Sequence, residues 1–342
     1  MCAERGCFPR SSSMSLSRPM ALSRVLLVFL LVSGTQAARQ QIIPRPENPF
    51  LDPKHDPYNP LRYIASNVLT AIAFALVMIV GMTQSWMVYK WGARFMLSMV
   101  IGCYTFSLGI GTRFGLHTNP EGKGLYIVEY LFVVLSPCAF IASEYVLLGR
   151  IARYVRGDKH LMVNPRRITV VFVSSDIATF LIQAVGGAVS VSANNLKLNK
   201  VGSNIFLAGL VVQLASLLTF TSIFLVFLHR VHANEPEAWS MHASKKWYQD
   251  WRALAGAMAF SMFGILIRSV YRVAELSQGY VGYLATTEGF FYGLDTLPLF
   301  IAISVYIFFW PGRIIGDGTP PMETAAPKDS SIDSVPAEPK EA

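Results

Sequence analysis

Long apolar stretches alternate with short polar segments from about residue 64 to residue 309. An α-helix rises about 1.5 Å per residue, so roughly 20 apolar residues are enough to cross about 30 Å of hydrocarbon. Each apolar stretch has about that length. The pattern therefore predicts an all-α integral membrane protein with seven transmembrane helices, near residues 64–86, 95–114, 125–148, 169–191, 203–228, 253–275 and 286–309.

The composition agrees with a lipid environment. Of 342 residues, 53% are hydrophobic and only 15% are charged, and the mean hydropathy is +0.42. A soluble protein needs more charge to cover its surface. The net charge of +8 does not indicate a nucleic-acid partner, because no segment interleaves basic and aromatic residues as nucleic-acid modules do.

The two ends of the chain differ from the apolar region. Residues 25–32 form an apolar run that is too short to span a bilayer, with Arg18 and Arg24 before it and small residues up to Ala37 after it. This predicts a cleavable signal peptide over residues 1–37, with an uncleaved anchor as the alternative. The proline-rich residues 38–60 are expected to form an extended external leader.

The membrane domain is then predicted over residues 61–312. Residues 313–342 are rich in Pro, Ala, Ser and mixed charge, which is typical of a disordered tail. Lysine and arginine gather in the loops that follow the third and fifth spans. By the positive-inside rule, the mature N-terminus lies outside and the C-terminus in the cytoplasm. With the signal peptide, this predicts a multi-pass plasma-membrane protein that travels through the secretory pathway.

Tryptophans at the predicted span edges are expected to anchor the cytoplasmic side at the lipid headgroup layer. They are Trp239, Trp247, Trp251 and Trp310.

Polar residues inside the spans are the candidates for function. A charge near the bilayer centre costs about 2.5–3.5 kcal/mol on insertion scales, and such residues usually face the bundle interior. At 100° per residue, the polar residues of the fourth, sixth and seventh spans fall within about 40° of one another, and Gln213 lies on a similar narrow stripe of the fifth span. They predict a polar core that either binds substrate or braces the helices, made of Asp176, Gln183, Gln213, Arg268, Arg272, Glu275, Glu288, Tyr292 and Asp295.

The predicted topology places most of these residues toward the external side. Arg113 ends the second span on the same side. One hypothesis is an external polar vestibule that closes near the middle of the bundle. The alternative is a set of structural ion pairs, because buried charges need partners.

Small and kinking residues complete the pattern. Gly186 and Gly187 allow close approach of another helix to the fourth span. Pro137 and Pro298 each free a backbone carbonyl that a partner must satisfy, so each predicts either a hinge or a simple bend.

Several kinds of chemistry find no support in the sequence. The chain has no G-x-x-x-x-G-K-[ST] motif and no H-E-x-x-H motif, so no nucleotide-driven motor or zinc protease is expected. His229, His232 and His242 do not have the spacing of zinc ligands. No nucleophile or metal constellation supports catalysis, so we assign no catalytic residue, no metal and no cofactor, and an intramembrane enzyme is the least favoured class.

Together, these spaced residues resemble the fungal seven-span lipid-translocating exporter family, also described as resistance-to-aminocholesterol-like proteins. The resemblance covers about residues 60–312. Its motifs in the third to fifth spans are Pro137, Ala142, Tyr145, Gly149, Arg150, Phe172, Asp176, Gln183, Gly186, Gly187, Gly209, Leu210 and Gln213. In the last two spans they are Arg268, Ser269, Tyr271, Arg272, Glu275, Gly279, Glu288, Tyr292 and Asp295.

Two positions of the second span depart from the family pattern. The family usually has a glutamate seven residues before the arginine that matches Arg113 and a tyrosine three before it, where this chain has Phe106 and Ile110. The last span ends in Trp-Pro-Gly instead of His-Pro-Gly.

The resemblance implies export or flipping of amphipathic lipids, such as sphingoid long-chain bases, phospholipids or toxic sterol-like molecules, with resistance to stress or drugs. The working hypothesis is that Glu288 or Asp295 contacts a cationic headgroup while Arg268 and Arg272 hold the acids in place. The expected partners are an amphiphilic small molecule and the bilayer. A seven-span receptor or sensor for an amphipathic ligand is the alternative.

Overall fold

The chain forms a bundle of long α-helices. The computed structural model describes residues 48–56, 58–155, 161, 165–192, 196–236, 239, 250–279 and 282–315, and no strand occurs among them. Seven helical segments are long and apolar enough to cross a membrane. Six are α2 (Asn67–Trp91), α3 (Leu97–Thr118, after the 3₁₀ turn η1, Arg94–Met96), α4 (Lys123–Tyr154), α5 (Pro165–Ser192), α6 (Leu196–Asn234) and α8 (Trp251–Ser277).

The seventh segment is composite. It begins with α9 (Glu288–Phe290), continues through the π-helical turn η4 (Phe291–Thr296) and ends with α10 (Leu297–Phe308), before the short α11 (Pro311–Ile314). The predicted all-α, seven-span class is confirmed, and most of the helices run several residues beyond their predicted ends. The predicted signal peptide, and the tail beyond residue 315, lie outside the described residues.

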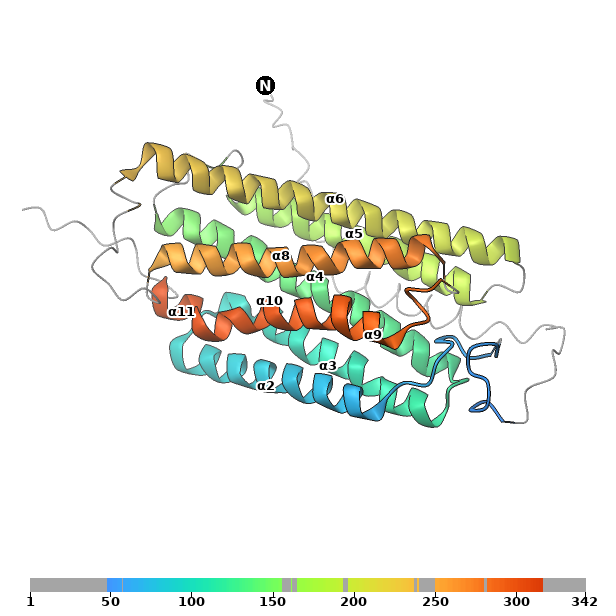
Figure 1. Cartoon of the computed structure of the whole chain (residues 1–342). Coiled ribbons are helices and arrows are strands. Elements are labelled where there is room, and N and C mark those ends of the chain that lie inside the picture. The colour runs from blue at the N-terminus through green and yellow to red at the C-terminus, as the bar shows by residue number, and fades with distance from the viewer. Residues whose placement is uncertain are drawn as a thin grey trace, which may run out of the picture.

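The helices lie side by side along one direction (Figure 1). Residues 48–56 and 58–66 lie at one end of the bundle, together with the turns that join α3 to α4 and α8 to α9. We call this the leader end. The opposite end holds α11 and the first turn of α8 (Figure 1).

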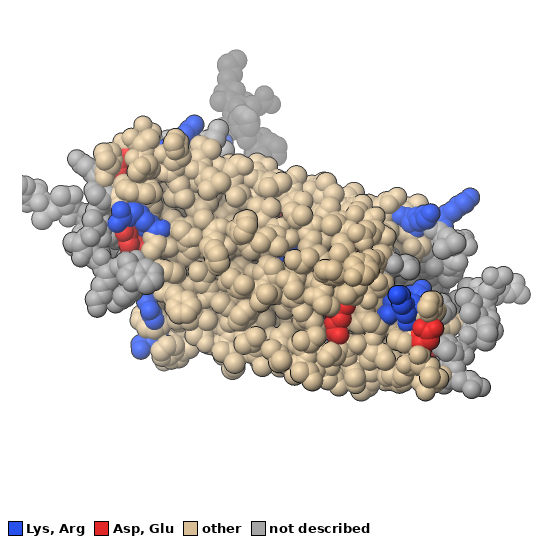
Figure 2. Space-filling view, viewed as in Figure 1, with Lys and Arg blue, Asp and Glu red and all other residues tan. Residues whose placement is uncertain are grey.

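Charged side chains gather at the two ends, and a broad belt almost free of charge lies between them (Figure 2). Large apolar residues face outward along this belt, among them Val211, Val212, Phe263 and Val270. An exposed apolar surface of this extent suits lipid and does not suit water.

The core is formed mainly by α2, α3, α4, α6, α8 and α10. Trp251 and Trp310 are fully buried in it. The expectation that these two rings anchor at the headgroup layer is therefore wrong, because they pack against protein. Trp239 is half-buried and packs edge-on against Trp251, with 5.4 Å between ring centroids, and Trp247 lies outside the described residues.

Helices α5 and α6 approach each other closely through small residues. A Cβ atom added at Gly186 would lie 2.5 Å from the backbone nitrogen of Phe206 and 2.9 Å from the carbonyl oxygen of Gly202. Only glycine fits such backbone contact, which is the arrangement expected between helices in lipid. Close packing here sets the position of Gln183 and Gln213, which extend from these two helices.

Candidate functional site

A buried ion cluster joins α8 to η4 near the leader end. The carboxylate Oδ1 of Asp295 lies 2.5 Å from Nε of Arg272 and 2.9 Å from Nε of Arg268. Arg272 also donates from Nη1 to Glu275 at 2.9 Å. Asp295 is fully buried, so two guanidinium groups offset the cost of removing its charge from water.

Pro137 provides a hydrogen-bond acceptor for the guanidinium of Arg268. A proline within a helix has no N–H, so the carbonyl four residues earlier loses its helical partner. That carbonyl belongs to Val133, and it accepts a hydrogen bond of 2.7 Å from Nη2 of Arg268. Ser136 Oγ donates to the same carbonyl at 3.2 Å. The proline therefore creates a docking point that ties α4 to α8.

A second ion cluster surrounds Arg113 of α3. Its Nη1 donates to Glu129 of α4 at 2.7 Å, and its Nη2 donates to the hydroxyl of Tyr63 at 2.8 Å and lies 3.3 Å from Glu288. The guanidinium also sits 4.2 Å from the centre of the Phe291 ring. Such a cation–π contact is strengthened when the charge is desolvated.

The start of α2 and the residue before it are held against this cluster. The backbone N–H of Ser66 donates to Glu288 at 2.8 Å, and the hydroxyls of Thr70 and Tyr292 lie 2.9 Å apart. Burial raises the pKa of Tyr63 to about 12, against the opposing effect of the positive charge of Arg113. Tyr63 therefore remains a neutral hydroxyl at ordinary pH.

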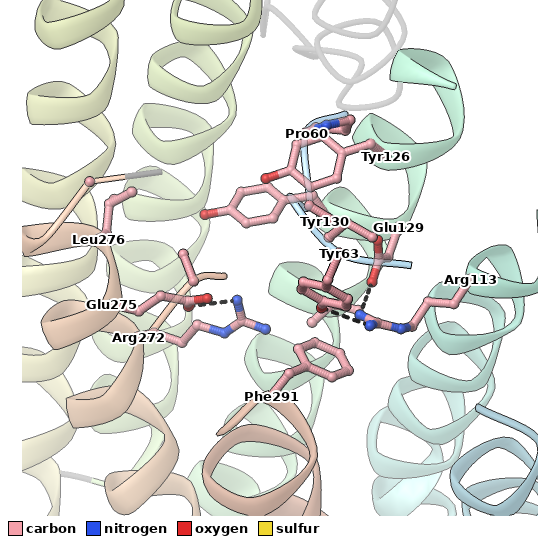
Figure 3. A pocket seen from close by; sticks show the side chains of 14 residues that line it. Pro60, Tyr63, Arg113, Tyr126, Glu129, Tyr130, Arg272, Glu275, Leu276 and Phe291 are labelled. Carbon is pink, nitrogen blue, oxygen red and sulfur yellow. Dashed lines mark hydrogen bonds and ion pairs between the residues drawn. The ribbon is translucent and has the colours of Figure 1, made fainter. Parts of the chain in front are cut away.

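The two clusters face each other across a cavity of about 620 Å³, which includes space open to the outside. Figure 3 shows Arg272 and Glu275 on one side, Arg113 and Glu129 on the other, and aromatic rings between them. We call this the leader-end cavity; it is lined by Pro60, Leu61, Tyr63, Arg113, Tyr126, Glu129, Tyr130, Val133, Arg272, Glu275, Leu276, Gly279, Ala285 and Phe291.

Buried polar atoms in this lining have unused hydrogen-bonding capacity. Oε2 of Glu129, Nη2 of Arg272 and Nε of Arg113 have no hydrogen-bond partner among the described residues. Such orphaned groups are uncommon in native proteins and indicate strain, water or a ligand. The unpartnered carboxylate oxygen makes the Glu129 side of the cavity suited to a hydrogen-bond donor.

The nine residues predicted as one polar core fall into separate groups. Arg268, Arg272, Glu275 and Asp295 form one cluster, while Glu288 and Tyr292 join Arg113 and the start of α2. The π-helical turn lies within the seventh segment and changes the helical phase. As a result, Asp295 contacts α8, whereas Tyr292 contacts α2.

The remaining predicted residues lie further along the bundle. Gln183 donates to Gln213 at 2.7 Å, and Gln213 donates to the sulfur of Cys138 at 3.3 Å. Asp176 accepts a hydrogen bond of 2.8 Å from Tyr145. Tyr145 is about 24 Å along α4 from Glu129, at about 1.5 Å per residue. None of these residues lines the leader-end cavity.

Two buried glutamates were not among the predicted site residues. Glu129 pairs with Arg113, sixteen residues earlier on the other side of a short turn, and this opposite-charge spacing across a helical hairpin was the available signal. Glu144 accepts hydrogen bonds from Ser261 at 2.7 Å and from Tyr306 at 2.6 Å. Its partners are hydroxyls on distant spans, so no local spacing marks it.

The described residues contain no group of three or more His, Cys, Asp or Glu side chains that could hold a metal ion. The buried carboxylates instead pair with guanidinium and hydroxyl groups. The arrangement is therefore suited to binding through charge and hydrogen bonds.

A family model described as RTA1 like protein matches residues 99–317, which run from the first turn of α3 to beyond the end of α11. The chain belongs to the RTA1-like family. Among its relatives is Protein RTA1 of Saccharomyces cerevisiae, which is 30% identical over 216 residues that cover 63% of this chain and 65% of the relative.

Two further relatives of this RTA1-like protein come from the same yeast. Protoporphyrin uptake protein 1 is 30% identical over 213 residues, covering 61% of this chain and 67% of the relative. Sphingoid long-chain base transporter RSB1 of strain YJM789 is 25% identical over 283 residues, covering 72% and 71%. The chain spans about 65% of the length of the first relative. No solved structure matches it.

Proposed function

We propose that this RTA1-like protein moves amphipathic molecules with a cationic headgroup, of the sphingoid long-chain base type, across the membrane that it spans. The observation that carries the proposal is the unpartnered carboxylate oxygen of Glu129 in the aromatic leader-end cavity. An ammonium group needs such an acceptor, and it also binds favourably over aromatic faces. The name of the sphingoid-base transporter relative agrees with this substrate class.

The balance of charge supports a cationic ligand. Three arginines meet four acids around the cavity: Arg113, Arg268 and Arg272 face Glu129, Glu275, Glu288 and Asp295. An added ammonium would bring the numbers of positive and negative groups level. Buried charge is tolerated only where it is compensated.

The residues that line the cavity point to a different pair of acids for headgroup binding. The initial hypothesis gave this role to Glu288 or Asp295, but neither lines the cavity, whereas Glu129 and Glu275 do. Asp295 is fully buried between Arg268 and Arg272, which fits the bracing part of the hypothesis. We therefore assign headgroup binding to Glu129 and Glu275.

We further propose that the leader end faces the cell exterior, at the plasma membrane. The distribution of lysine and arginine supports this orientation through the positive-inside rule. In this orientation, the leader-end cavity is open to the outside and receives or releases the headgroup there.

The test is translocation by the purified full-length protein in vesicles. The probes are a labelled long-chain amine and an alcohol with the same chain. We expect transport of the amine to exceed that of the alcohol. Glu129→Gln should slow the amine about tenfold or more, because a hydrogen bond to a charged group contributes about 1.5–3 kcal/mol.

Glu121→Gln is the matched control, because Glu121 lies in the neighbouring turn and does not line the cavity. Glu129→Asp keeps a negative charge opposite Arg113. This variant therefore shows whether slower transport in Glu129→Gln comes from a loss of folding when that ion pair is removed. Equal rates for wild type and Glu129→Gln would refute the role of Glu129. If the wild type binds the amine but does not transport it, the result would instead favour the alternative of a seven-span receptor or sensor.

A further inference from the structure

A second cavity lies between α4, α6 and α8, with a volume of about 380 Å³ that includes space open to the outside. We call it the side cavity. Its lining residues are Val134, Pro137, Leu210, Gln213, Leu214, Arg268, Ser269 and Arg272. No carboxyl group is among them.

The side-chain nitrogen atoms that line the side cavity have unused hydrogen-bond donors. Arg268 donates from Nη2 to the carbonyl of Val133. Its Nε lies 2.9 Å from Asp295 as an ion pair without a hydrogen bond, and no described residue accepts a hydrogen bond from its Nη1. The amide nitrogen of Gln213 donates one hydrogen to Cys138, which leaves its second hydrogen available. The lining is therefore suited to a ligand that carries a hydrogen-bond acceptor.

The surroundings of these donors are apolar. Arg268 lies about 13 Å along α8 from the end of that helix at Ser277, at about 1.5 Å per residue. Leu210 and Leu214 line the α6 side, and Val211 and Val212 beside them are exposed on the outer surface of α6. A polar group left unsatisfied at membrane depth costs several kcal/mol. A ligand that covers the donors and also continues into lipid would remove this cost.

We propose that the side cavity binds the phosphate of a membrane phospholipid, with the acyl chains lying along the apolar surface of α6 and α8. A phosphate oxygen is a strong acceptor for a guanidinium group. Exposed Val212 on α6 and Val270 on α8 provide the apolar surface for the chains. This site is distinct from the proposed amine site, because the acids of the leader-end cavity are absent from its lining.

The experiment measures lipid retained by the detergent-purified full-length protein in native mass spectrometry. The probes are phosphatidic acid, diacylglycerol with the same acyl chains, and inorganic phosphate. Leu214→Trp should fill the cavity and lower phosphatidic acid binding about tenfold, which corresponds to about 1.4 kcal/mol. Leu225→Trp is the matched control, because this side chain is 53% exposed on the same helix, about three turns from Leu214, and does not line the cavity.

Retention of phosphatidic acid over diacylglycerol, lost in Leu214→Trp and kept in Leu225→Trp, supports the proposal. Equal retention of the two lipids, or equal behaviour of the two variants, overturns it. Binding of inorganic phosphate without lipid would assign the site to a soluble anion and also contradict the proposal. If the wild-type protein does not transport the amine, the proposed function is rejected, but the phospholipid binding measured in this experiment is unaffected.

Discussion

At the scale of single residues, the bundle balances its buried charges with partners from distant parts of the chain. Phe106 illustrates this at the position where the family usually has a glutamate. Its fully buried ring lies 5.9 Å from the guanidinium of Arg268, which pairs instead with Asp295. The missing carboxylate of the second span therefore leaves no arginine of this cluster without a counter-charge.

Tyr63 gives a pH prediction at this scale. Its pKa is about 12 in the folded protein and 10.0 ordinarily. The folded state therefore holds this proton more tightly. Below about pH 10, Tyr63 is protonated in both the folded and the unfolded state and does not change the free energy of unfolding. As the pH rises toward 12, the free energy of unfolding should fall by up to roughly 2 kcal/mol. Thermal unfolding in detergent across this range measures the loss.

Tyr63→Phe should lose less stability than the wild type across the same pH range, because the ionising hydroxyl is gone. Tyr89→Phe is the control, since Tyr89 is 91% exposed at the opposite end of α2. Parallel loss in Tyr63→Phe and wild type would contradict the link between burial and this pKa.

At the scale of elements, the apolar pattern predicted each span because length and hydropathy alone decide whether a helix can cross a membrane. The same pattern could not predict the π-helical turn in the last span, and a uniform 100° phase therefore placed Asp295 on one face with Tyr292. Glu129 and Glu144 were missed because their partners come from other helices. The spacing of polar residues along a helix shows which face they share, but it does not show which other helix packs against that face.

The α5–α6 contact gives a prediction for elements. Gly186→Ala places a methyl group 2.5 Å from the backbone of Phe206, so the two helices must separate, at a cost of about 1–3 kcal/mol. Gly256→Ala is the matched control in α8, where nothing lies within 4 Å of the added atom, and better helix propensity should stabilise it slightly. Thermal unfolding in detergent compares the two variants, and equal melting temperatures would argue against close α5–α6 packing.

At the scale of the whole molecule, orientation is the next property to test. Leu51→Cys places a thiol at a position 82% exposed at the leader end, and Tyr89→Cys places one near the opposite end. If the leader end is external, a membrane-impermeant maleimide added to intact cells should label the first variant and not the second. After permeabilisation, both should react. The reverse pattern in intact cells would invert the proposed topology.

Arg272 lines both the leader-end cavity and the side cavity. An amine bound to Glu275, which pairs with Arg272, and a phosphate bound in the side cavity would therefore both act on this guanidinium. If the amine shifts Arg272 and thereby changes the affinity of the phospholipid, the phospholipid must change the affinity of the amine by the same factor. The lipid composition of the membrane would then tune the cargo affinity of the protein without any separate regulatory domain.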